Sequence, residues 1–172
     1  NSLIAQKVDA IAVSANDTDA LVPALKKAQD RGIKVISWDS GVAKDGRALH
    51  LNPSSSPLIG NMIIKLAADN LPEGGDVAVL SATATSTNQN VWIAIMKDTL
   101  KSDPKYKDMQ LVEVVYGNDE PQKSLTEAEA LLTKYPDLRG IIAPTTVGVA
   151  ACAQAVETAK KADQVAVTGL GT

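Results

Sequence analysis

The chain has 172 residues, of which 45% are hydrophobic and 22% charged, a composition typical of a folded globular protein and unlike that of a disordered one. The formal net charge is −3 at pH 7, and acidic and basic residues are interspersed, so we expect no binding to nucleic acid. No stretch approaches the roughly 18 to 20 apolar residues of a membrane span, and the first residues lack a signal-peptide pattern.

The residue types available for a core are unusual, because Phe is absent and aromatic residues make up only 3% of the chain. A core of Val, Ile, Leu and Ala suits a parallel sheet that is buried on both faces. The single cysteine, Cys152, excludes an internal disulfide and a thiolate metal site. Its apolar helical context predicts a small core residue.

Short runs rich in Val and Ile alternate with amphipathic patterns, which predicts βαβ units and a parallel sheet. The opening residues 1–7 read as the last turns of a helix already under way. Seven strands are predicted, at residues 10–14, 34–38, 48–51, 76–81, 110–116, 140–143 and 165–168. Five helices are predicted between them, at residues 17–31, 57–71, 88–101, 124–134 and 147–161.

Residues 51–57 interrupt this alternation, because two prolines and three serines follow a strand where a crossover helix should begin. Two interpretations are open from the residues alone. The segment is an ordinary loop with helix caps, which its composition favours, or it is a crossing between two lobes.

Polar residues follow four of the predicted strands, at residues 14–17, 38–41, 81–90 and 144–146. Ligands of open α/β sheets bind outside the carboxyl ends of the strands, so these are the candidate binding positions. Asp39 beside Trp38 pairs a carboxylate with an aromatic ring, which suits a polyol, although a turn cap is the alternative. The hydroxyls and amides of residues 81–90 suit sugar hydroxyls or, equally, a series of helix caps.

No arrangement for catalysis emerges from the sequence. His50 lies inside a predicted strand, which favours a surface or pairing role over that of a general base. Asp119, Glu120 and Lys123 read as a solvated helix start. There is no nucleophile elbow, phosphate loop, dinucleotide motif or metal spacing, so we expect neither a cofactor nor a bound metal.

Three segments, at residues 10–15, 21–28 and 32–40, are similar to the substrate-binding proteins of sugar ABC importers, of the ribose-binding type. The branch that the chain most resembles is that of rhamnose-binding and autoinducer-2-binding (LsrB-like) proteins. The most specific parts of the resemblance are Trp38-Asp39-Ser40, residues 86–92 and residues 141–149, and the likeness covers nearly the whole chain.

This resemblance implies the α/β fold of type I periplasmic binding proteins, with two parallel-sheet lobes joined by hinge strands and ligand held in the cleft. The chain would be a partial one, truncated at both ends. Residues 1–52 would then be the remainder of the first lobe and residues 53–172 the second lobe, including the first hinge crossing. The resemblance also implies a periplasmic protein with no enzymatic activity, which delivers a small sugar to an ABC permease in the inner membrane.

The resemblance also suggests individual roles. Asp39 matches a carboxylate that binds ligand hydroxyls, with Trp38 near the ligand. Asn88 and Gln89 occupy the places of an Asp-Gln pair in the autoinducer-2 branch. Its proline and small residue fall on Pro144 and Thr146.

Two of these positions depart from the autoinducer-2 pattern, because Asn88 replaces an acid and Thr146 a smaller residue. We therefore expect a deoxyhexose, rhamnose, in place of autoinducer-2. Gly171, within the closing residues 169–172, stands where the family often has a polar cleft side chain.

Three alternatives remain at this point. The first is an autoinducer-2 receptor of the same family. The second is the effector-binding core of a sugar-responsive repressor, which would follow a helix-turn-helix segment where a transporter protein would follow a signal peptide. The third is an α/β enzyme that acts on a sugar or its phosphate, which the missing base and phosphate loop disfavour.

Overall fold

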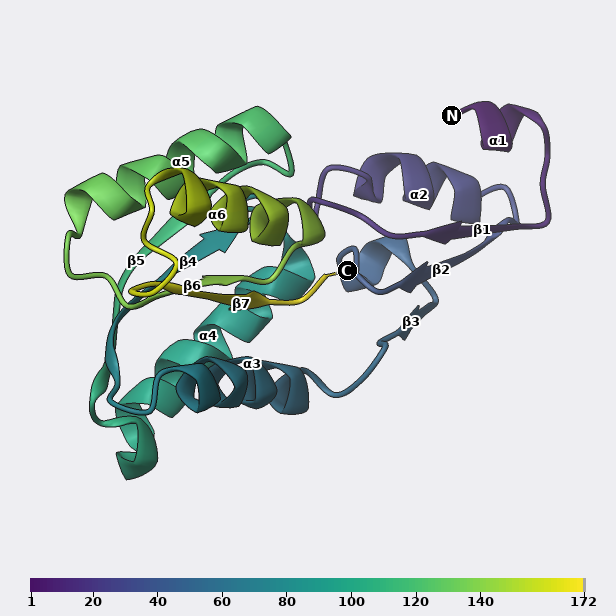
Figure 1. The fold of residues 1–172 in the computed structure, drawn as a ribbon. Coiled ribbons are helices and arrows are strands. Elements are labelled where there is room, and N and C mark those ends of the chain that lie inside the picture. The colour runs from purple at the N-terminus through teal and green to yellow at the C-terminus, as the bar shows by residue number, and fades with distance from the viewer. Residues whose placement is uncertain (172) are drawn as a thin grey trace. The chain divides into compact units, whose positions relative to one another are not determined.

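The computed structural model describes residues 1–171, which form an α/β protein with two parallel sheets (Figure 1). The predicted fold class is therefore confirmed. The chain divides into two compact units: unit 1 comprises Asn1–Ser56 and Thr85–Val91, and unit 2 comprises Pro57–Ala84 and the chain from Trp92 onward. The lobe boundary predicted after residue 52 stays a prediction.

Unit 1 contains the first sheet, whose three strands are parallel and lie in the order β1-β2-β3. Its elements are α1 (Ser2–Ala5), β1 (Ala10–Val13), α2 (Val22–Gln29), β2 (Lys34–Trp38), the short 3-10 helix η1 (Lys44–Gly46) and β3 (Leu49–Leu51). Because the strands are parallel, the residues that follow them meet at one edge of the sheet.

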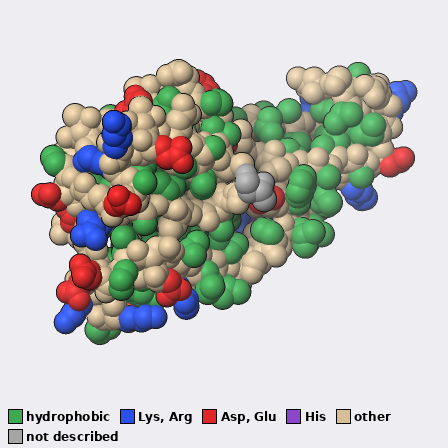
Figure 2. All heavy atoms as spheres, in the orientation of Figure 1, with side chains coloured by type: hydrophobic (Ala, Val, Ile, Leu, Met, Phe, Trp, Pro, Cys, Tyr) green, Lys and Arg blue, Asp and Glu red, His purple; other side chains and the backbone are tan. Residues whose placement is uncertain are grey.

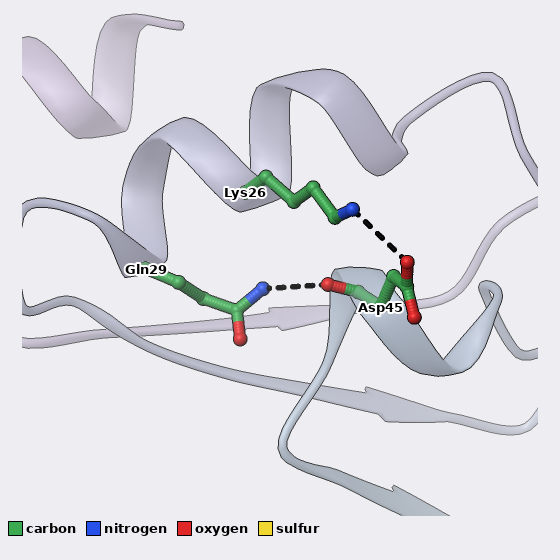
Figure 3. A network of polar contacts seen from close by, with 3 residues as sticks. All are labelled: Lys26, Gln29 and Asp45. Atoms are coloured by element: carbon green, nitrogen blue, oxygen red, sulfur yellow. Dashed lines mark hydrogen bonds and ion pairs between the residues drawn. The ribbon is translucent and has the colours of Figure 1, made fainter.

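Helix α2 covers one face of this sheet, where Leu25 and Ala28 pack with Ile11 and Val35. Its exposed side is tied to η1 by Lys26 and Gln29, which contact Asp45 at 3.0 and 3.2 Å (Figure 3).

The opposite face of the sheet is apolar and exposed. It carries Ile36, Trp38, Leu49 and Leu51, which are 37%, 51%, 59% and 66% exposed. The Trp38 ring therefore belongs to a sheet face that no described residue buries.

The predicted start of α2 is wrong, because the helix begins at Val22 and not at Asp17. The Asp17 carboxylate accepts hydrogen bonds from the backbone N–H groups of Asp19 and Ala20, both at 2.8 Å, and so closes a turn of its own. Pro23 then occupies the first turn of the helix, where a proline costs no backbone hydrogen bond.

Unit 2 contains the second sheet, whose parallel strands lie in the order β5-β4-β6-β7. Its elements are α3 (Ser56–Asn70), β4 (Gly75–Ser81), α4 (Thr87–Ser102), the 3-10 helix η2 (Pro104–Tyr106), β5 (Met109–Tyr116), α5 (Pro121–Lys134), β6 (Gly140–Ala143), α6 (Thr146–Thr158) and β7 (Ala166–Gly169). The first residues of α4, through Val91, and Ser56 at the start of α3 belong to unit 1. All seven predicted strands of the chain are confirmed to within one residue at each end.

Helices cover both faces of this second sheet, as Figure 1 shows. Along β4, Val77 and Val79 join the core formed with α3 and α4, whereas Ala78 and Leu80 join the core formed with α5 and α6. This alternation explains why β4 reads as a continuous apolar run. On the face drawn in Figure 2, acidic and basic side chains are interspersed.

Candidate functional site

The strand order of unit 2 marks one place, at the carboxyl ends of β4 and β6, as the expected ligand crevice. The chain runs from β4 outward to β5 and then returns to place β6 on the other side of β4. This reversal is the topological switch point at which open α/β sheets bind ligands, beyond the carboxyl ends of the two strands. The segments at that point are the loop after Ser81 and the loop from Pro144 to Thr146.

The loop after β6 joins a buried strand to the first turn of α6. Pro144 and Thr145 are buried, and Thr146 is exposed. Thr145 is the N-cap residue of α6, yet its hydroxyl makes no cap hydrogen bond and donates to the Asp119 carboxylate after β5. A Cβ on Gly171 would lie 2.7 Å from the Cα of Thr146, so glycine permits the close approach of the two backbones.

In unit 1, Asp39 directly follows β2 and adopts a left-handed backbone conformation, with φ of 55°. This conformation is uncommon for residues other than glycine. It is held from both sides, because Asp39 N–H donates to Leu51 C=O at 3.0 Å and Ser40 C=O accepts from Ala15 N–H at 3.0 Å. The half-buried Asp39 side chain is thus fixed at the carboxyl edge of the first sheet.

Asp17 supplies a second carboxylate in the loop after β1. The N–H groups of Ala20 and Asp19 that donate to it lower the pKa of this carboxyl below its usual value. The side chain remains ionised at neutral pH, but its hydrogen bonds serve the turn.

The start of α4 belongs to unit 1 and contains two of the predicted ligand residues. The Thr87 hydroxyl lies 2.7 Å from the Thr18 hydroxyl and donates to Gly41 C=O at 2.8 Å. Asn88 Oδ1 accepts a hydrogen bond from Gln89 N–H at 2.7 Å, and Gln89 is 8% exposed. Part of the polar run 81–90 therefore serves the helix start.

His50 has the pairing role that its position in a strand predicts. Its Nδ1 lies 2.8 Å from the buried Ser37 hydroxyl, and its Nε2 lies 2.7 Å from Asn52 Oδ1. Within residues 1–171 there is no group of three or more His, Cys, Asp or Glu side chains that could hold a metal ion. Among the same residues, every helix is too short or too polar to cross a membrane.

A family model described as a periplasmic binding protein domain matches residues 1–172. The chain belongs to the periplasmic binding protein family. The family that the sequence predicts is therefore confirmed.

Three relatives show how this family member compares with characterised proteins. The D-ribose/D-allose-binding protein of Pseudomonas aeruginosa is 30% identical over 97% of this chain and 53% of its own length. An ABC transporter solute binding protein from Clostridium phytofermentas with bound L-rhamnose is 43% identical, with a TM-score of 0.95 over 99% of this chain and 53% of that one.

LsrB from Clostridium saccharobutylicum, in complex with AI-2, is 27% identical, with a TM-score of 0.92 over 99% of this chain and 55% of that one. The chain thus spans about half the length of these relatives.

Unit 1 of this periplasmic binding protein contains four of the six predicted ligand residues: Trp38, Asp39, Asn88 and Gln89. Pro144 and Thr146 lie in unit 2, at its switch point. Their ligand roles remain predictions. Asp119, the third residue after β5, was not among the predicted ligand residues, yet it accepts a hydrogen bond from the Thr145 hydroxyl at the switch point. Its place soon after a strand was the available signal.

Proposed function

We propose that the protein binds a small sugar, a deoxyhexose such as L-rhamnose, as the solute-binding component of an ABC importer. The observation that carries this proposal is the 43% identity, over 99% of the chain, with a solute binding protein that holds L-rhamnose. The predicted ligand residues follow strand ends, where ligands of parallel sheets bind.

The chemistry of the predicted ligand residues supports a neutral, hydroxyl-rich ligand. The Asp39 carboxylate accepts hydrogen bonds only, the amides of Asn88 and Gln89 both donate and accept, and the Thr146 hydroxyl does either. Sugar hydroxyls need both kinds of partner. The half-exposed Trp38 ring offers apolar surface to the C–H bonds of a sugar ring. We propose that these six residues contact the sugar.

Rhamnose is favoured over AI-2 by two kinds of observation. The protein with bound L-rhamnose is 43% identical to the chain, whereas LsrB with bound AI-2 is 27% identical. At the residue level, Asn88 has no charge and Thr146 has a branched side chain. By resemblance, the autoinducer-2 branch has an acid and a smaller residue at these two places. Loss of an acceptor charge and added bulk both disfavour a small ligand at these places.

The remaining parts of the proposal concern the whole protein. We propose that it works in the periplasm, carries out no reaction of its own and delivers its sugar to a permease in the inner membrane. Titration calorimetry against L-rhamnose, other deoxyhexoses, ribose and an AI-2 preparation tests the ligand. Tightest binding of AI-2 would make the protein a receptor of that signal, and no binding of any of them would refute the proposal.

The Asp39 assignment has its own test. We expect Asp39→Ala to weaken sugar binding about 10- to 100-fold, because hydroxyls that bond to a carboxylate lose a charge-assisted partner. Asp45→Ala is the matched control, since it removes an acid of unit 1 that is 72% exposed and whose carboxylate pairs with Lys26; the Asp45 C=O that accepts from Gln29 is kept. Equal affinity of both variants, measured by calorimetry, would contradict the role of Asp39.

A further inference from the structure

The turn after β5 brings a carboxylate across the end of β4 to the loop after β6. In the sheet, β4 lies between β5 and β6, so a residue after β5 reaches β6 only by crossing the end of β4. Gly117 N–H donates to Ser81 C=O at 2.9 Å, and Asn118 N–H donates to Ala82 C=O at 2.6 Å. These bonds fold the turn over the end of β4, and the Asp119 carboxylate then accepts the Thr145 hydroxyl.

The backbone of this turn is held in an uncommon conformation. Asn118 and Asp119 are consecutive and both have positive φ, 57° and 54°, while Glu120 N–H donates to Gly117 C=O at 3.0 Å. Two central residues with positive φ characterise a type I′ turn. Such conformations cost free energy in residues other than glycine and persist where the surrounding structure enforces them. The location of Asp119 is therefore set by the fold.

Thr145 is held as firmly as its partner. It is 9% exposed, and a Cβ on Gly148 would lie 2.8 Å from its methyl group. With the methyl group packed in this way and a branched Cβ, the side chain has little rotameric freedom. Its hydroxyl points to Asp119 instead of capping its own helix. The neighbours of Thr145 on either side are the proposed sugar contacts Pro144 and Thr146.

We propose that Asp119 is a positioning residue for sugar binding. By holding Thr145 it fixes the backbone that runs from Pro144 into the first turn of α6, and so it sets where the Thr146 hydroxyl lies. This inference rests on the proposed function and adds to it a residue that supports a contact without touching the sugar. Binding groups need such support, because displacements of about half an ångström already weaken a directional hydrogen bond.

The test compares L-rhamnose affinity in a double-mutant cycle. We expect Asp119→Ala and Thr145→Val each to weaken binding about tenfold, the value of a hydrogen bond to a charged group. The double variant should bind no more weakly than either single one, because both remove the same interaction. Thr145→Ser keeps the hydroxyl and should restore wild-type affinity. Asp163→Ala, which removes an exposed acid between α6 and β7, is the control for charge.

A purely structural role predicts a different result. It would lower the melting temperature of the Asp119 and Thr145 variants and leave their affinity for L-rhamnose unchanged, which would overturn the inference. Additive losses in the double variant would overturn it as well. Thr145→Val preserves the shape of the side chain, so it keeps the test open if Asp119→Ala fails to fold.

A second readout separates this inference from the proposed function. Val149 N–H donates to Thr145 C=O at 2.9 Å, so its amide hydrogen exchange reports how firmly Thr145 is held without any sugar present. We expect exchange to be about tenfold faster in Asp119→Ala, in proportion to the lost hydrogen bond. If the wild type binds none of the sugars, the proposed function fails alone; unchanged exchange at Val149 overturns the positioning role.

Discussion

Cys152 shows how burial alone decides the chemistry of a side chain. It lies on α6 in the core between that helix and the sheet of unit 2, and desolvation raises the pKa of its thiol to about 12. At pH 8 only about one thiol in ten thousand is then ionised, and the thiolate is the nucleophile. We expect the folded protein to resist Ellman's reagent and the protein in guanidinium to react fully. Stoichiometric labelling of the folded protein within minutes would contradict this assignment.

The two tryptophans provide a matched test of the predicted sugar contact at Trp38. Trp38 is 51% exposed and Trp92 is 7% exposed. If a sugar packs near Trp38, its indole leaves water, so we expect L-rhamnose to shift the fluorescence emission to shorter wavelength. Trp38→Phe should abolish that shift, and Trp92→Phe should retain it. A shift that is lost in Trp92→Phe and kept in Trp38→Phe would contradict the predicted contact between Trp38 and the sugar.

Individual residues also show where sequence reasoning stops. Asp39 could be singled out because it follows an apolar strand directly, and the neighbouring Trp38 supports that choice. Asp119 also lies soon after a strand, but the charges of Asp119, Glu120 and Lys123 made a solvated helix start the simpler interpretation. Its partner Thr145 is 26 positions away along the chain, and local patterns carry no information about contacts at that separation.

At the scale of elements, strands were predicted more accurately than helix starts. The central strands β4 and β6 of unit 2 are buried on both faces, so each reads as an apolar run with clear ends. Helix α5 begins at Pro121, three residues before the predicted start at 124. The prediction missed this first turn because its residues do not belong to the apolar pattern that marks the rest of the helix. Helix α2 begins five residues after the predicted 17, because the turn at Asp17 takes up the residues between.

The turn between β5 and α5 depends on a glycine. A Cβ on Gly117 would lie 2.9 Å from the Ser124 Cα and closer still to the Ser124 hydroxyl. We expect Gly117→Ala to lower the free energy of unfolding by about 1–3 kcal/mol, as overpacking against a helix does. Ser124→Ala is the control at the same contact, since the Ser124 hydroxyl is buried without a hydrogen-bond partner and its removal should cost no stability. Urea unfolding of both variants tests this, and a stable Gly117→Ala would show that the turn can move.

At the scale of the whole molecule, the chain has two units with separate cores, and the predicted ligand residues are divided between them. Each unit repeats the same arrangement, in which parallel strands end in polar loops. A ligand that binds only the folded protein stabilises it by mass action, by about 2.7 kcal/mol at one hundred times its Kd. If the predicted residues of either unit contribute to sugar binding, the melting temperature in the presence of sugar should depend on them.

Substitutions at the predicted sugar contacts test this dependence in each unit separately. We expect excess L-rhamnose to raise the melting temperature of the wild type, and Asp39→Ala in unit 1 and Thr146→Ala in unit 2 each to reduce that rise at the same sugar concentration. Thr126→Ala is the control in unit 2, because its hydroxyl is exposed and donates to Gln122 C=O in its own helix. A full rise in Thr146→Ala would mean that the switch point of unit 2 contributes no binding energy, and the sugar contacts would then have to be sought in unit 1.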